Sequence, residues 1–442
     1  MTDPHHAGRP VSPGHAQAAR ATRPLLHNAV FATVSSGSSV LLLALLIVAA
    51  RTLGDQVYGR FSFALALAVI FETLMDFGLK EVTTRAIARE PRHAMPYLQN
   101  TFGLKLALGA GSLVVLAVAV VILRPEPDVR WAAVLLGVAA VLRSYMTTIR
   151  GVFMGVDRFE LETVVLVSDR LLVLTFGAAA LLLGYGLIGF AMAFMAGRLA
   201  AFLLAAGVTA RAVGRPTPAF DLEFWRDLQL CAIPFGAFIV VLQLYNYLDI
   251  VMLGVMRGDS ETGLYSAAYR VYEGFSNIPS IIAVVLAPRL AREFVSDRGS
   301  HRRTAFRGVW TAAALGIPAA LGALVAAPFL VQVLFGASYA QSASVLQILA
   351  AGFVVVFPLA VLHVVAISTN AVRPLLVTAI LGAIVNGAAN LVLIPTYGMH
   401  GAAVATIIGE TVSLCVLGAG LWRRRLLYTP CGGEGIRFSS EH

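Results

Sequence analysis

Twelve long apolar segments fill most of this 442-residue chain. A helix needs about 20 apolar residues to cross the hydrocarbon core of a bilayer. Only 13% of the residues are charged, about half the share of a soluble domain. The folded chain therefore has too few charged side chains to form a surface exposed to water. The segments are continuous, unlike the alternating strands of a β-barrel, and therefore predict an all-α polytopic membrane protein. The predicted spans are 28–50, 61–79, 102–123, 131–149, 163–183, 187–208, 229–255, 263–288, 308–335, 343–368, 371–395 and 399–422.

Lys and Arg are distributed unevenly between the two sides of the predicted membrane domain. When alternate connections are assigned to one side, starting with the N-terminal tail, that side receives 23 of these residues, the other side receives five, and five lie within spans. Positive residues favour the cytoplasmic side, so we expect both termini in the cytoplasm. The net charge of +9 then belongs to a rim that favours anionic lipids, and no nucleic-acid partner is expected.

Two motifs of the first half recur in the second half. Five residues between positions 54 and 64 return in the same order at 258–268, 204 positions later, and Phe61 is matched there by Tyr265. The motif at 185–193 returns at 397–405, at an offset of 212. Each half holds six spans, so the two copies share one orientation, as in transporters built from parallel repeats. The sequence thus predicts two six-helix lobes, in which the turn at 54–64 and its copy are outer elbows.

The expected domain boundaries follow from this duplication. Residues 1–27 are polar and predict a disordered cytoplasmic tail. The two lobes cover 28–208 and 229–422, joined by a cytoplasmic or interfacial linker at 209–228, where aromatic residues lie beside charged ones. Residues 423–442 are expected to form a second cytoplasmic tail.

The sequence does not contain the patterns typical of enzymes. It has no nucleotide-binding loop, nucleophile motif or metal-ligand spacing. The three cysteines, Cys231, Cys415 and Cys431, form no such pattern and are interpreted as packing residues. We therefore expect no catalytic residue, no metal and no cofactor.

Positive side chains within or near the spans are the first candidates for a binding site, because charge in lipid is costly and is usually retained for function. Arg143 lies in span four, and Arg150 follows two turns later on the same face. A guanidinium group binds phosphate in a fork geometry, so these two arginines could form a ladder for a phosphate. Lys105 in span three and Arg270 in span eight complete the set. The alternatives are a pair between Arg143 and Asp169, and a Lys105 side chain that reaches the membrane surface.

Three acidic residues are candidates for a coupling-ion site or for structural pairs. Asp249 lies near the outer end of span seven, and Asp169 lies in span five. Glu273 follows Arg270 by three residues, a spacing that lets the two side chains pair on one helix face. For Asp249 the alternative is a packing role within the helices.

Five motifs distinguish this chain from other polytopic membrane proteins. They are Arg-x-Leu-Gly-Asp-x-x-Tyr-Gly-Arg-Phe at 51–61, Asp-Phe-Gly-Leu at 76–79, Tyr-Leu-Asp-Ile-Val-Met-Leu-Gly at 247–254, Gly-Leu-Tyr-Ser-Ala-Ala-Tyr-Arg at 263–270 and the segment 386–403. Together they resemble the polysaccharide transporter family, the oligosaccharide flippases of the multidrug/oligosaccharidyl-lipid/polysaccharide exporter superfamily. The resemblance covers residues 28–422, nearly the whole chain.

This resemblance implies a function and a cellular location. Members of the family move undecaprenyl-pyrophosphate-linked oligosaccharides from the cytoplasmic to the outer leaflet, for O-antigen, capsule or exopolysaccharide. Their two lobes alternate between inward-open and outward-open forms around a central cavity. The resemblance therefore implies a multi-pass protein of the bacterial inner membrane. Its partners would be the lipid-linked glycan and the polysaccharide polymerase and chain-length machinery.

Two alternative functions remain open at this point. The first is a cation-coupled multidrug antiporter of the same superfamily. That class resembles proteins with a buried acidic residue in span one, but residues 28–50 contain no acidic residue. A non-transporting membrane scaffold of the polysaccharide machinery would need no unpaired arginine in a cavity.

Overall fold

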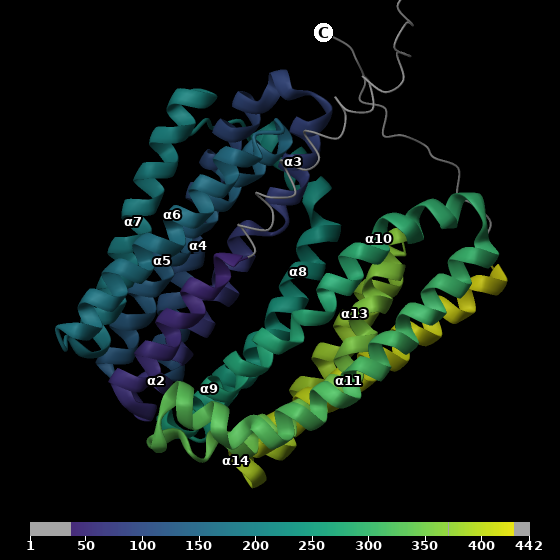
Figure 1. Ribbon diagram of the computed structural model, residues 1–442. Helices are drawn as coiled ribbons and strands as arrows, with labels where there is room; N and C mark the ends of the chain where they lie inside the picture. The colour runs from purple at the N-terminus through teal and green to yellow at the C-terminus, as the bar shows by residue number, and fades with distance from the viewer. Residues whose placement is uncertain (1–36, 370, 428–442) are drawn as a thin grey trace, which may run out of the picture. The chain divides into compact units, whose positions relative to one another are not determined.

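The computed structural model describes residues 37–369 and 371–427, whose regular secondary structure is helical with no β-strand. The all-α prediction is therefore confirmed. The predicted tail 1–27, most of the predicted tail 423–442 and Cys431 lie outside the described residues. The helices of Figure 1 are α2 Ser39–Asp76, α3 Leu79–Arg89, η1 Pro91–His93, α4 Ala94–Leu123, α5 Pro127–Gly155, α6 Phe159–Leu182, α7 Gly186–Ala212, α8 Leu222–Met256, α9 Asp259–Ser276, α10 Ile278–Ser296, α11 Arg298–Phe335, η2 Ala337–Tyr339, α12 Ser342–Ala351, α13 Phe353–Ser368 and α14 Val372–Leu427.

Within the described residues, the predicted spans fall on these helices. Among the described residues, eight helices are long and apolar enough to cross a membrane, and the bent pair α12–α13 makes a ninth candidate. Two of the eight contain two predicted spans each, because α2 is interrupted by a non-helical Gly54 and α14 by a non-helical Gly398. The predicted span 263–288 falls on α9 and α10, which meet at Asn277. Eleven of the twelve predicted spans thus fall on these candidates, the first of them over its described part only, whereas α9 and α10 are not among the candidates.

The repeated glycines adopt matching backbone conformations in the two halves. Gly54 has φ 76° and ψ 168°, and Gly258, 204 positions later, has φ 89° and ψ −170°. Gly186 and Gly398, which are 212 positions apart, have φ 63° and 55°. A side chain with a Cβ strongly disfavours these positive φ values, so both halves depend on glycine at the same places. The internal duplication is therefore structural as well as sequential.

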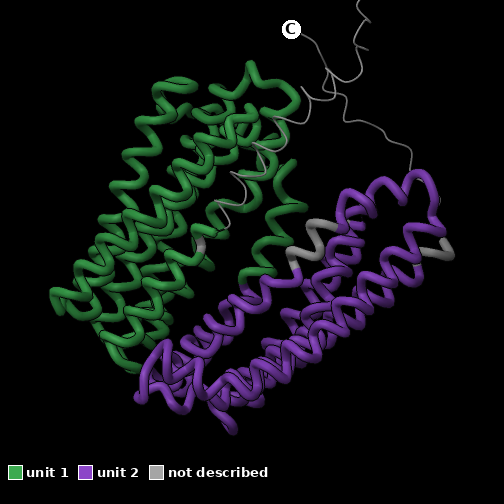
Figure 2. The backbone as a smooth tube through the Cα atoms, viewed as in Figure 1, with its two compact units in different colours: residues 1–243 green, residues 244–442 purple. Residues whose placement is uncertain are grey.

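The chain divides into two compact units, residues 1–243 (unit 1) and 244–442 (unit 2), which Figure 2 shows in green and purple. The division lies within α8, so a single continuous helix contributes to both units. The domain boundaries expected from the repeat, at 28–208 and 229–422, remain a prediction.

Unit 1 is a bundle in which α4, α5, α6 and α7 run side by side (Figure 1). Its core contains fully buried apolar side chains from successive helices, including Ile87, Leu98 and Phe153. On the other face of α4, Val118 and Ile122 are exposed. This exposure suits a helix whose outer face lies against lipid. Buried and lipid-facing positions are therefore both apolar, and composition alone does not separate them.

Unit 2 is a bundle of the later helices. The long helix α11 packs along α13, and α13 also contacts α10 and α14 (Figure 1). Leu359 and Ala366 of α13 pack with Leu417 of α14 in its apolar core. The unit also includes the second half of α8, from residue 244 onward.

The connection between α7 and α8 is attached to α4. Residues 213–221 are the only non-helical part of the expected linker 209–228. The backbone N–H of Ala219 donates to the backbone carbonyl of Gln99 at 3.0 Å. The side-chain amide of Gln99 donates to the hydroxyl of Thr217, also at 3.0 Å. Gly103 allows this approach, since a Cβ at that position would lie 1.9 Å from the Ala219 carbonyl oxygen.

We expect Gly103→Ala to lower the thermal midpoint of the detergent-solubilised protein. The added methyl group would displace the connection from α4, at a cost of about 1–3 kcal/mol. Gly111→Ala in the same helix is the matched control, because nothing lies within 4 Å of its Cβ position. That control should gain about 0.5–1 kcal/mol from reduced backbone entropy. Equal midpoints for the two variants would show that the connection does not pack on α4.

Candidate functional site

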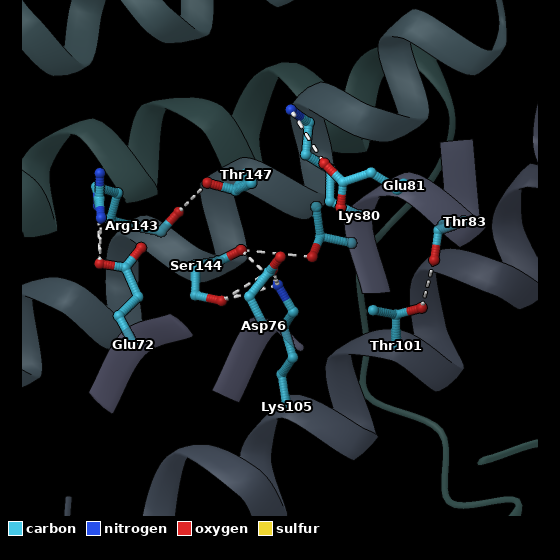
Figure 3. Close-up of polar contacts among 11 residues, drawn as sticks. Glu72, Asp76, Lys80, Glu81, Thr83, Thr101, Lys105, Arg143, Ser144 and Thr147 are labelled. Atoms are coloured by element: carbon cyan, nitrogen blue, oxygen red, sulfur yellow. Dashed lines mark hydrogen bonds and ion pairs between the residues drawn. The ribbon is translucent and has the colours of Figure 1, made fainter. Parts of the chain in front are cut away.

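Lys105 of α4 is fully buried and binds two neighbouring helices (Figure 3). Its ammonium group donates to the Asp76 carboxylate of α2 at 2.5 Å and to the carbonyl and hydroxyl oxygens of Ser144 of α5, each at 2.8 Å. The local fold places Asp76 here, because α2 ends at this residue and both Phe77 and Gly78 have positive φ. Lys105 therefore does not reach the membrane surface, and all three hydrogens of its ammonium group have acceptors.

Arg143 of α5 pairs with Glu72 of α2 rather than with Asp169. Its Nε and Nη2 atoms donate to the same Glu72 oxygen at 2.8 and 2.6 Å, as Figure 3 shows. The Glu72 side chain is only 7% exposed, whereas that of Arg143 is 34% exposed. The alternative pair between Arg143 and Asp169 is thus wrong, because α2 supplies a nearer carboxylate that is not apparent from the spacing along the chain.

Arg150, two turns further along α5, also has a carboxylate partner. Its Nε and Nη2 atoms donate to Glu162 of α6 at 2.7 and 2.5 Å. The two arginines of the expected ladder therefore lie on one helix, and each is paired with a neighbouring helix. Pairing of this kind orients a guanidinium group and neutralises most of its charge.

Asp169 of α6 faces Arg198 of α7, with 3.3 Å between Oδ2 and Nη1. Both side chains are buried, and the Arg198 guanidinium also lies over the Phe194 ring at 5.4 Å. Hydrogen bonding here is incomplete. Within the described part of the chain, Asp169 Oδ1 and the Nε and Nη1 atoms of Arg198 and of Arg170 are buried without a hydrogen-bond partner.

These charged side chains of α2, α4, α5, α6 and α7 form one group inside unit 1, which we call the N-terminal charge cluster. The charges of Arg143, Arg150, Asp169 and Arg198 act on Arg170, and those of Glu72 and Arg143 act on Arg198. With five cations and four carboxylates, the cluster carries one excess positive charge. Its members are Lys105, Arg143, Arg150, Arg170, Arg198, Glu72, Asp76, Glu162 and Asp169.

In unit 2, Arg270 and Glu273 of α9 pair with each other. Arg270 Nη1 donates to Glu273 Oε2 at 2.8 Å, which confirms the pair expected from their spacing. The side chain of Arg270 is 10% exposed and that of Glu273 is 45% exposed. The acid therefore lies at the rim of the unit, unlike the buried Asp249.

Asp249 of α8 accepts hydrogen bonds from three neutral side chains of unit 2. Tyr265 of α9 donates at 2.9 Å, and two residues of α14, Asn390 and Thr406, donate at 2.5 and 2.7 Å. Asn390 also donates to Asn386 at 3.2 Å. We call these five residues the Asp249 network, and all of them are buried. Asn390 Oδ1 and Asn386 Nδ2 have no partner among the described residues.

Sequence reasoning identified Asp249 but did not assign a role to the rest of this network. A signal was present, since Asn386 and Asn390 are amides four residues apart in an apolar span. That spacing places both on one helix face. Tyr265 lies in the repeated turn, and Thr406 comes just after the second repeated motif. Each side chain alone resembles an ordinary polar packing residue, so only their convergence on Asp249 distinguishes them.

A family model described as "Polysaccharide biosynthesis protein" matches residues 25–294, more than half of the chain. The uncharacterized protein Rv3630 of Mycobacterium tuberculosis (strain H37Rv) is 25% identical over 330 residues, 71% of this chain and 73% of that protein. Uncharacterized protein Rv1510 of the same strain is 26% identical over 299 residues, 67% of each chain.

Solved transporter structures share the fold. The lipid II flippase MurJ, in an inward closed conformation, has a TM-score of 0.73 at 14% identity and covers 89% of this chain and 87% of its own. An inward-facing multidrug resistance MATE family transporter of the MOP superfamily has a TM-score of 0.72 at 15% identity and covers 90% and 98%. The protein is therefore a multi-pass membrane protein with the MOP-superfamily fold, and it belongs to the polysaccharide biosynthesis protein family.

Proposed function

We propose that this protein is a flippase for undecaprenyl-pyrophosphate-linked oligosaccharide, acting from the cytoplasmic to the outer leaflet in O-antigen, capsule or exopolysaccharide synthesis. The observation that carries the proposal is the N-terminal charge cluster, in which five cations face four carboxylates. A net positive interior attracts an anionic group and repels a cationic drug. The family match supplies the link to polysaccharide synthesis.

The substrate's chemistry matches what a lobed membrane protein can offer. Its pyrophosphate needs cations with many N–H donors, and arginine supplies five donors in a rigid fork. Its glycan is polar and needs a wet path, while its lipid tail can remain in the bilayer. We expect Arg143, Arg150, Lys105 and Arg270 to bind the substrate. Alternation of the two lobes would then move the bound substrate between the leaflets.

We further propose the inner membrane of a bacterium as the location, with both termini in the cytoplasm. The support is the excess of Lys and Arg on one side, 23 against five. The polysaccharide polymerase and the chain-length machinery are the proposed partners, because the transported glycan is their substrate.

Of the three candidate acids, we propose Asp249 as the site for a coupling cation. Asp169 faces Arg198 and Glu273 pairs with Arg270, whereas the hydrogen-bond partners of Asp249 are all neutral. A buried carboxylate surrounded by hydroxyl and amide oxygens suits a proton or a small hard cation, which prefers oxygen ligands. Cation binding there would neutralise a charge that is costly in lipid.

The first test is transport by the purified protein in proteoliposomes. We expect a fluorescent undecaprenyl-pyrophosphate glycan to move between leaflets, and a cationic dye to remain where it was loaded. Protein-free liposomes are the control. Movement of the dye without movement of the lipid-linked glycan would overturn the flippase proposal in favour of the drug antiporter. Movement of neither substrate would favour the scaffold.

A second test separates the structural role of Arg143 from its binding role. Arg143→Gln alone leaves Glu72 buried and unpaired, so we expect a loss of stability of about 3–5 kcal/mol together with loss of transport. In the double variant Arg143→Gln, Glu72→Gln the buried charge is gone, and the thermal midpoint should recover while transport stays lost. Recovery of both would contradict a substrate role for Arg143 and assign it to the helix pair alone.

A third test addresses coupling. Asp249→Asn removes the carboxylate at nearly constant volume, so an imposed proton or sodium gradient should no longer accelerate transport. Glu273→Gln, which alters a half-exposed acid, should leave that acceleration intact. The measurement is the rate of glycan movement with and without each gradient. Normal gradient dependence in Asp249→Asn would remove this residue from coupling.

A further inference from the structure

Arg170 of α6 differs from the other cations of the N-terminal charge cluster. Lys105, Arg143 and Arg150 each donate at least two hydrogen bonds to acceptors on neighbouring helices. Within the described residues, the Nε and Nη1 atoms of Arg170 are buried and have no hydrogen-bond partner. Buried polar groups in proteins are almost always bonded, and an unbonded charged donor is costly. Two nitrogens of this guanidinium group therefore have no acceptor among the described residues.

Arg198 adds to the same imbalance. Its Nε and Nη1 atoms are also buried without a hydrogen-bond partner among the described residues, although Asp169 lies 3.3 Å from Nη1. Together Arg170 and Arg198 present four such nitrogens, each bearing at least one hydrogen. The nearby Asp169 Oδ1 is a single oxygen that could serve them. This part of the cluster therefore has too many donors and too few acceptors.

The charge balance points in the same direction. The positive charges of Arg143, Arg150 and Arg198 all act on Arg170, and Asp169 is the acid that opposes them there. Water could fill the site, but water donates as well as accepts and brings no negative charge. A phosphate group has only acceptor oxygens when fully ionised and carries the opposite charge. It would satisfy the donors and neutralise the excess cation together.

We propose that Arg170, assisted by Arg198, is the direct contact for the phosphate groups of the transported substrate. The inference rests on the flippase function proposed above and identifies its anion-binding residue. It adds Arg170 and Arg198 to the binding cations proposed above. Of those cations, Arg150 is held by Glu162 of α6, the helix that carries Arg170.

The experiment compares binding and stability in the full-length protein in detergent. The probe is farnesyl pyrophosphate, a short soluble isoprenoid pyrophosphate, titrated by calorimetry, with farnesol as the uncharged control. Arg170→Gln should weaken binding of the pyrophosphate roughly 10- to 100-fold, the range expected for lost hydrogen bonds between charged groups. Arg170→Lys keeps the charge but loses the fork, so it should bind between these limits. Arg211→Gln, an exposed arginine of α7 outside the cluster, should bind as the wild type does.

Stability without ligand distinguishes a binding role from a structural one. Because two buried nitrogens of Arg170 have no hydrogen-bond partner among residues 37–369 and 371–427, Arg170→Gln should leave the thermal midpoint unchanged or raise it. It should also abolish the increase in midpoint that farnesyl pyrophosphate produces in the wild type. A midpoint lowered as far as in Arg143→Gln would make Arg170 a structural residue and overturn the inference.

The remaining outcomes separate this inference from the proposed function. If the wild type transports the lipid-linked glycan and binds the probe, but Arg170→Gln binds equally well, the anion contact lies elsewhere and the flippase function stands. The same conclusion follows if the wild type transports the glycan without binding the probe. If the wild type neither binds farnesyl pyrophosphate nor transports the glycan, the proposed function and the inference fail together.

Discussion

Charge pairing inside an apolar bundle is the interaction on which the arrangement of unit 1 depends. In a bilayer there is no water to solvate a buried charge, so a carboxylate inside the bundle is stabilised by a cation or by hydrogen-bond donors on neighbouring helices. Lys105 joins α4 to α2 and α5 through Asp76 and Ser144. Arg143 joins α5 to α2, and Arg150 joins α5 to α6. Since the apolar faces are chemically alike, these pairs help to specify which helices are neighbours.

The need to stabilise buried charge also makes Arg170 and Arg198 unusual within the N-terminal charge cluster. Three cations of the cluster are held by carboxylates and hydrogen bonds, while Arg170 and Arg198 have buried nitrogens with no acceptor in the described part of the chain. A site that binds an anion only transiently must have donors left over when the anion is absent. The fully paired residues can then provide rigidity, and the incompletely paired ones can provide binding.

The two repeated halves share a backbone plan but carry different charged side chains. Gly197 and Gly409 occupy equivalent places at the offset of 212, so the next residues, Arg198 and Glu410, are equivalent too. The first half has a cluster with an excess of cations, whereas the second half has a buried Asp249 among neutral donors. The repeated turns show how little of this divergence affects the backbone, because Gly54 and Gly258 keep nearly the same φ and ψ. The buried charged side chains therefore differ between the halves, whereas the glycine turns keep nearly the same backbone conformation.

The sequence by itself determined the helical class, the positions of the spans and the two-fold repeat, because hydropathy and glycine at positive φ act locally along the chain. It also predicted the Arg270–Glu273 pair, whose members lie on one helix turn. Only the tertiary structure decided that Arg143 pairs with Glu72, 71 residues away, and that four residues from two other helices surround Asp249. Helices with similar apolar surfaces can pack in many orders, and sequence spacing does not rank them. The incompletely bonded Arg170 emerges only after every other partner is known, since a missing contact is a property of the whole fold.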